Sequence, residues 1–182
     1  SESIAAFSPA AQWVFIPFMT LAGVNFALFW YLFNDEPRTL FADTEFRVYL
    51  GLVTGFAAVL AVGLFYGGAP ATEIGGATER EVASALRHGA FQVASLMNST
   101  GFATANFAAW DTHTRLFLLL VMFVGGSAGS TGGGLKVVRW LVVAKTLYRE
   151  LYVTANPDVV RPVRLGGEVV NEDVIRGILV FT

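Results

Sequence analysis

The chain has 182 residues, of which 54% are hydrophobic and 14% are charged, and its formal net charge is -2. A soluble domain carries about 25% charged residues, so this composition indicates an integral membrane protein. No basic patch with interleaved aromatic residues points to nucleic acid, and the absence of cysteine excludes disulfides and thiolate metal sites.

Two membrane spans are predicted in the first third of the chain. Residues 13–33 carry no charge and, at about 1.5 Å per residue, are long enough to cross a hydrocarbon core, with a kink expected at Pro17. A charged linker over residues 34–47 separates this span from a second one over residues 48–66. Small residues along the second span favour close packing against another helix.

Residues 79–97 predict a helix that crosses only half of the membrane. Their first half is charged and their second half is apolar, and an apolar run this short is typical of a re-entrant helix. The helix runs directly into residues 98–107, which are rich in small and hydroxyl side chains. This order predicts a re-entrant pore loop.

The next apolar element begins near Arg115 and continues past Arg149, which is too long for one straight span. Its middle reads GGSAGSTGGGLK, from Gly125 to Lys136. Unpaired backbone groups cost several kcal/mol in hydrocarbon, so we expect this segment to break the span and to line a protein-enclosed cavity. Cations accumulate beyond it, which by the positive-inside rule places residues 140–172 and 34–47 in the cytoplasm and the pore loop outside.

Both ends of the chain look cut. The chain starts at Ser1, and its last apolar run, VIRGILVFT, is too short to span a bilayer. We therefore expect an internal piece of a larger transporter or channel.

The first candidate site is a cation filter at Ser99, Thr100, Gly101 and Phe102. A filter needs carbonyl oxygens that replace the hydration shell of the ion, and glycine can aim consecutive carbonyls in one direction. The alternative is an ordinary external turn. The half-span helix before these residues favours the filter.

The second candidate site is the glycine-rich segment, for which three interpretations are open. It is a mobile gate, a packing break without motion, or a phosphate-binding loop. The segment lacks the Gly-Lys-Ser/Thr ending that is typical of a phosphate-binding loop. The candidate gate residues are Gly125, Gly126, Ser127, Ala128, Gly129, Ser130, Thr131, Gly132, Gly133, Gly134 and Lys136. Arg139 is either a barrier at the inner mouth or a snorkelling side chain. No catalytic set and no metal-ligand spacing is evident, so we do not expect an enzyme.

Residues 98–104 (NSTGFAT) and 123–139 (FVGGSAGSTGGGLKVVR) together resemble the Trk/Ktr/HKT superfamily of potassium transporters, most closely a TrkH/KtrB-like membrane subunit. By this resemblance residues 1–42 correspond to the end of repeat 2, with its second helix and cytoplasmic linker. Residues 43–165 correspond to repeat 3, with first helix, pore helix, filter and broken second helix, and residues 166–182 to a truncated start of repeat 4.

The resemblance implies an all-α membrane protein of helix–re-entrant pore loop–helix repeats. Four repeats would surround one pore for potassium uptake or symport across the plasma (inner) membrane, with K⁺ held by carbonyls around Thr100, Gly101 and Phe102. It also implies a multi-pass homodimer, TrkA/KtrA-like cytosolic nucleotide-binding regulatory subunits, and no cofactor in this chain. Two alternatives stay open, a Na⁺-permeable member of the family and a non-conducting subunit or enzyme that binds a lipid or nucleotide.

Overall fold

The chain is mainly helical, as predicted, and the computed structural model describes residues 4–33, 37–68, 82–155, 162–165 and 168–181. The helices are α1 (Pro9–Ala22), α2 (Phe26–Phe33), α3 (Pro37–Ala42), α4 (Thr44–Gly63), α5 (Val82–Met97), α6 (Thr112–Phe123), α7 (Val137–Ala155) and α8 (Glu172–Phe181). Short helical turns at Ile4–Ala6, Leu64–Gly68 and Phe107–Ala109 and the strands β1 (Arg164–Leu165) and β2 (Glu168–Val169) complete the described elements.

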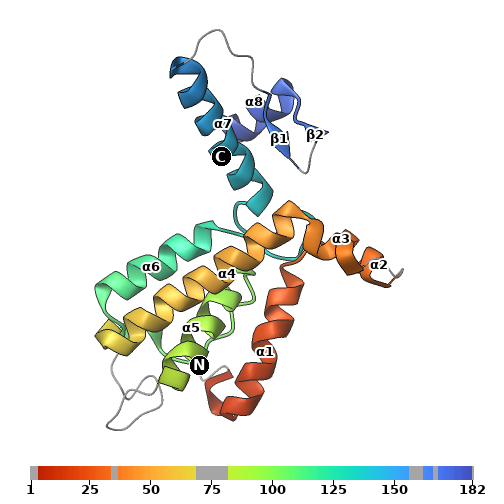
Figure 1. Cartoon of the computed structure of the whole chain (residues 1–182). Helices are drawn as coiled ribbons and strands as arrows, with labels where there is room; N and C mark the ends of the chain where they lie inside the picture. Colours follow the sequence, from red (N-terminus) through yellow and green to blue (C-terminus); the bar gives the residue numbers. More distant parts are fainter. Residues whose placement is uncertain (1–3, 34–36, 69–81, 156–161, 166–167, 182) are drawn as a thin grey trace.

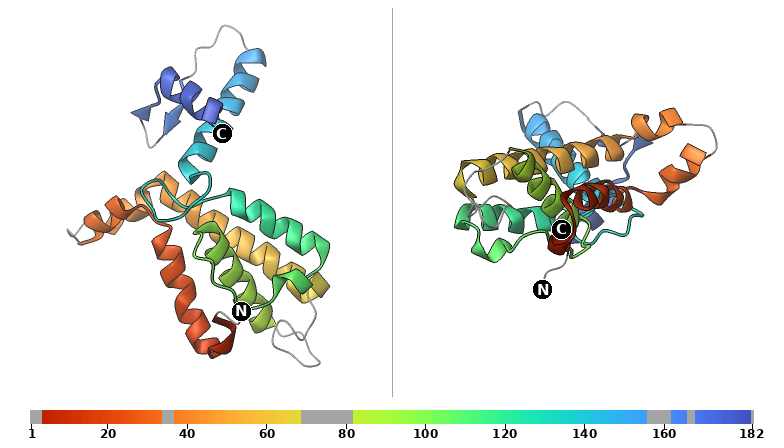
Figure 2. Two further views of the ribbon diagram at one scale, coloured as in Figure 1. Left: turned by 180° about the vertical axis from the view of Figure 1, so that it is seen from behind. Right: turned by 90° about the horizontal axis from the view of Figure 1, so that it is seen from below.

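Helix α5 lies at the centre of the packing. It contacts α4, α1 and α6, and most of its side chains are buried (Figure 1). The largest apolar cluster joins α5 to α4 and α6 through residues such as Val53, Val93 and Val121. Helix α7 points away from this body and, with α8 and the hairpin β1–β2, forms a second small cluster around Val142, Val163 and Ile175 (Figure 2).

The first predicted span is broken, and the break lies at Gly23–Asn25. Helix α1 ends at Ala22, α2 begins at Phe26, and the two are bent by 100°. Helix α1 continues through Pro17, where a kink was predicted, and the chain breaks six residues later, at Gly23, where no break was predicted. The structural reason is the docking of the glycine-rich segment in this break, described below.

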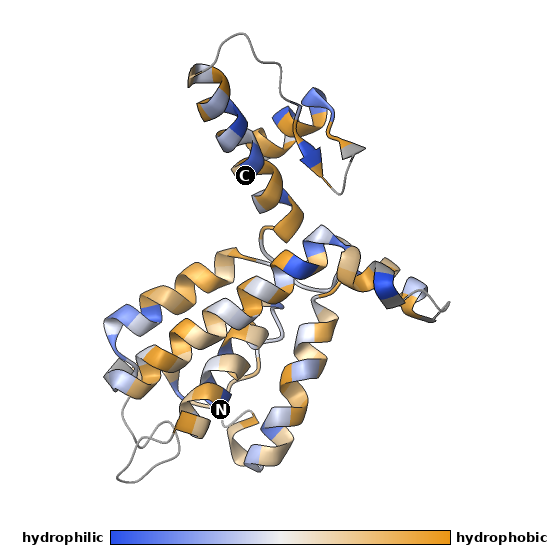
Figure 3. Ribbon diagram, in the orientation of Figure 1, coloured by the Kyte–Doolittle hydropathy of each residue, from blue (hydrophilic) through white to orange (hydrophobic). Residues whose placement is uncertain are grey.

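Helix α4 begins earlier than predicted, inside the expected linker. Asp43 caps it by accepting a hydrogen bond from the Phe46 N–H at 2.7 Å, so part of the linker is helical, while residues 34–36 lie outside the described residues. Among the described helices, Thr44–Gly67 is the one that is long and apolar enough by itself to cross a membrane, and α1 and α2 reach this length only together, as a bent pair. Apolar residues dominate α1, α4 and α6 (Figure 3).

The third apolar element is broken where its composition predicted. Helix α6 ends at Phe123, α7 begins at Val137, and the segment between them is irregular. Helix α5 falls within the predicted helix of residues 79–97, of which residues 79–81 lie outside the described residues. The antiparallel pairing of β1 with β2 was not predicted.

Candidate functional site

The turn after α5 brings the candidate filter residues to the protein surface. Helix α5 closes with a hydrogen bond from the Thr100 N–H to the Ser95 carbonyl at 2.9 Å. Ser99 and Gly101 then take the left-handed backbone conformation, with φ of 54° and 77°. A non-glycine residue adopts this conformation rarely, so the turn is held by its surroundings. Residues 99–102 are all exposed.

Hydrogen bonding divides the four candidate filter residues into two groups. The Ser95 hydroxyl donates to the Phe102 carbonyl at 2.6 Å, which directs that oxygen toward α5, and the Phe102 ring packs edge-on against Phe15. Within the described part of the chain, the carbonyls of Ser99, Thr100 and Gly101 accept no hydrogen bond. These three consecutive oxygens are chemically suited to replace water around a cation.

A buried polar cluster supports the turn from below. The Tyr49 hydroxyl on α4 lies 2.8 Å from the Thr20 carbonyl and 3.1 Å from Oδ1 of Asn98, and the Asn98 amide donates to Ala94 at 2.9 Å. Gly23 faces the same cluster, where a Cβ atom would lie 1.9 Å from Asn98 Oδ1. The break after α1, the helix α4 and the foot of the turn therefore meet at one point.

The two ends of the glycine-rich segment are joined to each other. The Gly125 N–H donates to the Leu135 carbonyl at 2.9 Å, and the Leu135 N–H donates to the Phe123 carbonyl at 3.2 Å. A Cβ atom on Gly125 would lie 2.0 Å from the Gly133 carbonyl oxygen, so only glycine fits this approach. The segment is a closed loop with a tip around Ala128.

The tip of this loop fills the break between α1 and α2. Its Ser127 and Thr131 N–H groups donate to the Gly23 and Ala22 carbonyls at 2.9 and 3.3 Å, and the Phe26 N–H donates to the Gly129 carbonyl at 3.3 Å. Backbone groups at helix ends need partners inside a membrane. Here backbone groups of the loop tip and of the helix break form hydrogen bonds with one another.

The glycine loop also touches the candidate filter turn directly. The Gly133 N–H donates to the Ser99 hydroxyl at 3.2 Å, and Gly132 lies close to the Met97 carbonyl at the end of α5. The structure thus brings together the two segments that the sequence singled out. It does not bring Arg139 into the loop, because Arg139 belongs to the first turn of α7.

Two charged side chains hold the loop. Oε1 of Glu45 accepts a hydrogen bond from the Ala128 N–H at 2.7 Å, and the Lys136 ammonium folds back onto the carbonyls of Ser130 and Gly132. Sequence reasoning missed Glu45, since 83 residues separate it from its partner. It also missed Ser95 and Tyr49, for which the sequence contains no motif, and it gave Asn98, the first residue of the NSTGFAT motif, no role of its own.

The phosphate-loop interpretation is disfavoured by the way the loop uses many of its backbone N–H groups. A phosphate site needs several backbone N–H groups that point at the ligand. The N–H groups of Gly125, Ser127, Ala128, Thr131 and Gly133 are donated to protein acceptors. Five N–H groups of the loop are therefore already used within the protein, and the Gly-Lys-Ser/Thr ending of a phosphate loop is absent from the sequence.

A polar cluster on the other side of α5 ties down the chain after the candidate filter turn. Nδ1 of His88 lies 2.8 Å from the Thr104 hydroxyl, and the Arg87 guanidinium donates to Oε1 of Gln12 at 2.6 Å. All four side chains are buried. Among the described residues, no group of three or more His, Cys, Asp or Glu side chains is placed to hold a metal ion.

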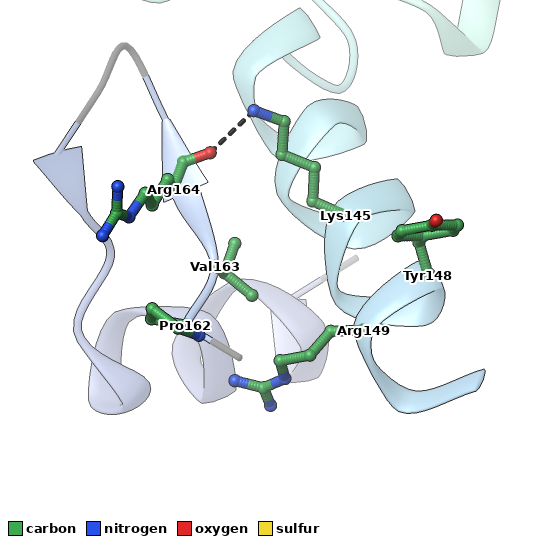
Figure 4. A pocket seen from close by; sticks show the side chains of 6 residues that line it. All are labelled: Lys145, Tyr148, Arg149, Pro162, Val163 and Arg164. Carbon is green, nitrogen blue, oxygen red and sulfur yellow. Dashed lines mark hydrogen bonds between the residues drawn. The ribbon is translucent and has the colours of Figure 1, made fainter. Parts of the chain in front are cut away.

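A pocket of about 470 Å³ lies far from these elements, between α7 and β1 (Figure 4). Its cations already have protein partners. Lys145 donates to the Arg164 carbonyl at 2.6 Å, and Arg149 pairs with Glu150 and Glu172. These carboxylates raise the pKa of the Arg149 guanidinium. The pocket is therefore a junction between α7, α8 and the hairpin.

Comparisons with known proteins cover the whole chain. A family described as TrkH, cation transport protein, matches residues 1–182. The Trk system potassium uptake protein TrkG of Escherichia coli is 31% identical over 100% of this chain and 36% of its own length. The Trk system potassium uptake protein TrkH of Salmonella typhimurium is 29% identical over 96% of this chain and 34% of its own length.

A solved structure has the same fold. The crystal structure of the potassium transporter TrkH from Vibrio parahaemolyticus matches with a TM-score of 0.87 at 28% identity, over 99% of this chain and 37% of that chain. The chain thus spans about a third of the length of the proteins it matches.

Proposed function

The chain belongs to the TrkH family of cation transport proteins, and from this premise we propose that it forms part of a membrane subunit that takes up potassium. The family consists of membrane transporters and not of enzymes. The relatives of this chain, TrkG and TrkH, are named as Trk system potassium uptake proteins, and the helices of this chain superpose on those of a potassium transporter. These names support K⁺ as the ion that this protein carries.

The observation that carries the proposal is the row of three carbonyls at Ser99, Thr100 and Gly101. They are exposed, consecutive and without hydrogen bonds from the described residues. We propose that they form one quarter of a K⁺ filter, with the other quarters supplied by similar turns in a four-repeat pore. The Phe102 carbonyl is left out of this set, because it is bonded to Ser95.

The glycine loop is proposed as the gate of the same pore. Its contact with the candidate filter turn, through Gly133 and Ser99, supports this proposal, because the loop touches the residues that are proposed to bind the ion. In the described arrangement the loop is closed on itself and fills the α1–α2 break. Lys136 and Arg139 then lie at the inner mouth, where their charges oppose the entry of cations.

The wider assembly is proposed from the family resemblance. The repeats are proposed to meet at residues 42/43 and 165/166. The complete protein is proposed to be a homodimer that works as a symporter and binds TrkA/KtrA-like regulatory subunits in the cytosol. The proposed topology is multi-pass in the plasma membrane, with residues 34–47 and 140–172 on the cytoplasmic side.

Substitution of Gly101 tests the filter. Its φ of 77° is strained for any side chain, and a β-branched residue is worst, so Gly101→Val moves the neighbouring carbonyls. We expect the preference for ⁸⁶Rb⁺ or K⁺ over Na⁺ to fall by about tenfold or more, the equivalent of about 1.4 kcal/mol of lost discrimination. Uptake into cells that lack their own potassium transporters is the measurement.

Gly51→Val is the matched control for this experiment. Gly51 lies on an exposed face of α4, and a Cβ atom there meets no atom of the described chain within 4 Å. Full discrimination in the Gly101 variant overturns the filter assignment. Equal permeation of Na⁺ and K⁺ in the unmodified protein favours the Na⁺-permeable alternative.

A further inference from the structure

The carboxylate of Glu45 makes the most unusual contact of the glycine loop. Glu45 lies in the first turn of α4 and is half-buried, and its Oε1 accepts the Ala128 N–H at 2.7 Å. A carboxylate in a first turn normally interacts with the positive end of its own helix. Here it reaches across to the tip of a segment 83 residues away.

The other described bonds that hold the loop to neighbouring elements use neutral partners. They join Ser127 and Thr131 to backbone carbonyls of the α1–α2 break, and Gly133 to the hydroxyl of Ser99. A hydrogen bond to an ionised acceptor is roughly twice as strong as one between neutral groups. Glu45 therefore supplies the one carboxylate acceptor among the described bonds that hold the loop tip to neighbouring elements.

The bond between Glu45 and Ala128 lies at the part of the loop that fills the α1–α2 break. Ala128 lies between Ser127, which is bonded to Gly23, and Gly129, which is bonded to Phe26. A displacement of the tip out of the α1–α2 break must therefore separate Ala128 from Glu45. The bond between Gly125 and Leu135 at the base of the loop is unaffected by such a movement.

We propose that Glu45 is a positioning residue that latches the glycine loop in its closed arrangement. Opening of the loop breaks the bond between the Glu45 carboxylate and the Ala128 N–H, and closing restores it. This inference rests on the proposed function, in which the loop gates the pore. It adds a specific residue outside the loop that sets how readily the gate opens.

The variants Glu45→Ala and Glu45→Gln separate the parts of this contact. Glu45→Ala removes the acceptor, whereas Glu45→Gln keeps an acceptor oxygen and removes the charge. The control is Asp43→Asn, which removes one negative charge from the same end of α4, keeps a good N-cap and has no described contact with the loop. Asp43 accepts from Phe46 and has no described contact with Ala128.

The first measurement is basal ⁸⁶Rb⁺ flux into proteoliposomes that contain the complete protein. We expect Glu45→Ala to raise the flux by about tenfold, Glu45→Gln by about threefold, and Asp43→Asn to leave it unchanged. Size-exclusion chromatography checks that each variant is folded. Unchanged or reduced flux in a folded Glu45→Ala protein overturns the latch.

The second measurement does not depend on transport. Ala128→Cys, on a cysteine-free background, keeps the backbone N–H and reports access to the loop tip through its rate of reaction with a water-soluble thiol reagent. We expect Glu45→Ala to accelerate this reaction by about tenfold. If the unmodified protein carries no ⁸⁶Rb⁺, the proposed function fails, while an unchanged reaction rate at position 128 overturns the latch in either case.

Discussion

Single residues at the foot of the candidate filter turn show how tightly this part of the chain is packed. Asn98, Tyr49 and Gly23 come from three different segments, and Asn98 and Tyr49 are almost completely buried. Buried polar groups of this kind need their partners, because a lost hydrogen bond leaves the other group unsatisfied. The spacing between the turn and α4 is therefore fixed by polar contacts as well as by apolar packing.

Replacement of Gly23 by alanine is expected to destabilise the protein. The added Cβ would lie 1.9 Å from Asn98 Oδ1 and 2.2 Å from the Tyr49 hydroxyl, so the cluster must move apart. Such overpacking costs about 1–3 kcal/mol. We expect a lower apparent melting temperature, by several degrees, in fluorescence-detected size-exclusion chromatography.

Gly51→Ala is the control for this prediction, because a Cβ at Gly51 meets open space within the described chain. If both variants have the same apparent melting temperature as the unmodified protein, the close contact at Gly23 does not hold in solution.

The candidate filter shows the limit of sequence analysis at the residue scale. The sequence presents residues 99–102 as four equivalent candidates, since a motif does not say where each carbonyl points. In the structure the Phe102 carbonyl is bonded to Ser95, while Ser99 connects to the glycine loop. Both relationships depend on the left-handed backbone at Ser99 and Gly101.

At the scale of elements, two apolar helices are broken and only one break was placed correctly. The glycine loop is visible in the sequence because its composition is local. The break at Gly23–Asn25 is stabilised by the loop, whose Thr131 bonds to Ala22 across 109 residues. One local signal existed, since Oδ1 of Asn25 accepts from the Ala27 N–H at 2.9 Å as a helix cap does.

Glycine in the loop has a steric role in addition to the mobility expected of it. A Cβ on Gly126 would lie 2.6 Å from the Ser130 hydroxyl and 2.9 Å from the Gly23 carbonyl. These glycines let the loop enter the α1–α2 break. If the loop is a gate, its closed state is thus a specific packed arrangement and not a disordered plug.

Shortening the loop at its tip is expected to raise basal flux. Deletion of Ala128 and Gly129 removes the bonds to Glu45 and Phe26 and leaves the base of the loop joined by Gly125 and Leu135. The loss of one charge-assisted hydrogen bond, about 1.5 kcal/mol or more, shifts an equilibrium by about tenfold. The measurement is ⁸⁶Rb⁺ flux in proteoliposomes.

The K⁺/Na⁺ ratio of the same deletion variant is the internal control, because the filter turn is untouched. Increased flux with an unaltered ratio supports a gate that is separate from the filter. Unaltered flux in a folded protein leaves the packing break as the better interpretation of the loop.

At the scale of the whole molecule, the described chain divides into a helical body and a smaller unit of α7, α8 and the hairpin (Figure 1). Composition predicted the body, since its helices are apolar and uncharged over most of their length. The hairpin was missed, although Gly166-Gly167 between two short apolar–polar pairs is a sequence pattern typical of a tight turn. Strands of two residues give too little alternation to be recognised.

The orientation of these two parts across the membrane can be tested with a matched pair of alanines. Ala109 follows the filter turn and Ala155 ends α7, and both are exposed. Cations such as Lys145 and Arg149 lie on α7, the helix that Ala155 ends, and Arg164 is bonded to Lys145, and such residues are retained on the cytoplasmic side. We therefore expect Ala109 to face outward and Ala155 to face the cytoplasm.

Labelling of Ala109→Cys and Ala155→Cys with a membrane-impermeant thiol reagent distinguishes the two sides. In intact cells the variant at position 109 should be labelled almost completely and the variant at position 155 hardly at all, and permeabilisation should make both react. The same side chain is introduced at both positions, so intrinsic reactivity is matched. The reverse pattern would invert the topology and place the glycine loop on the outer side of the filter, where it would meet the incoming ion first.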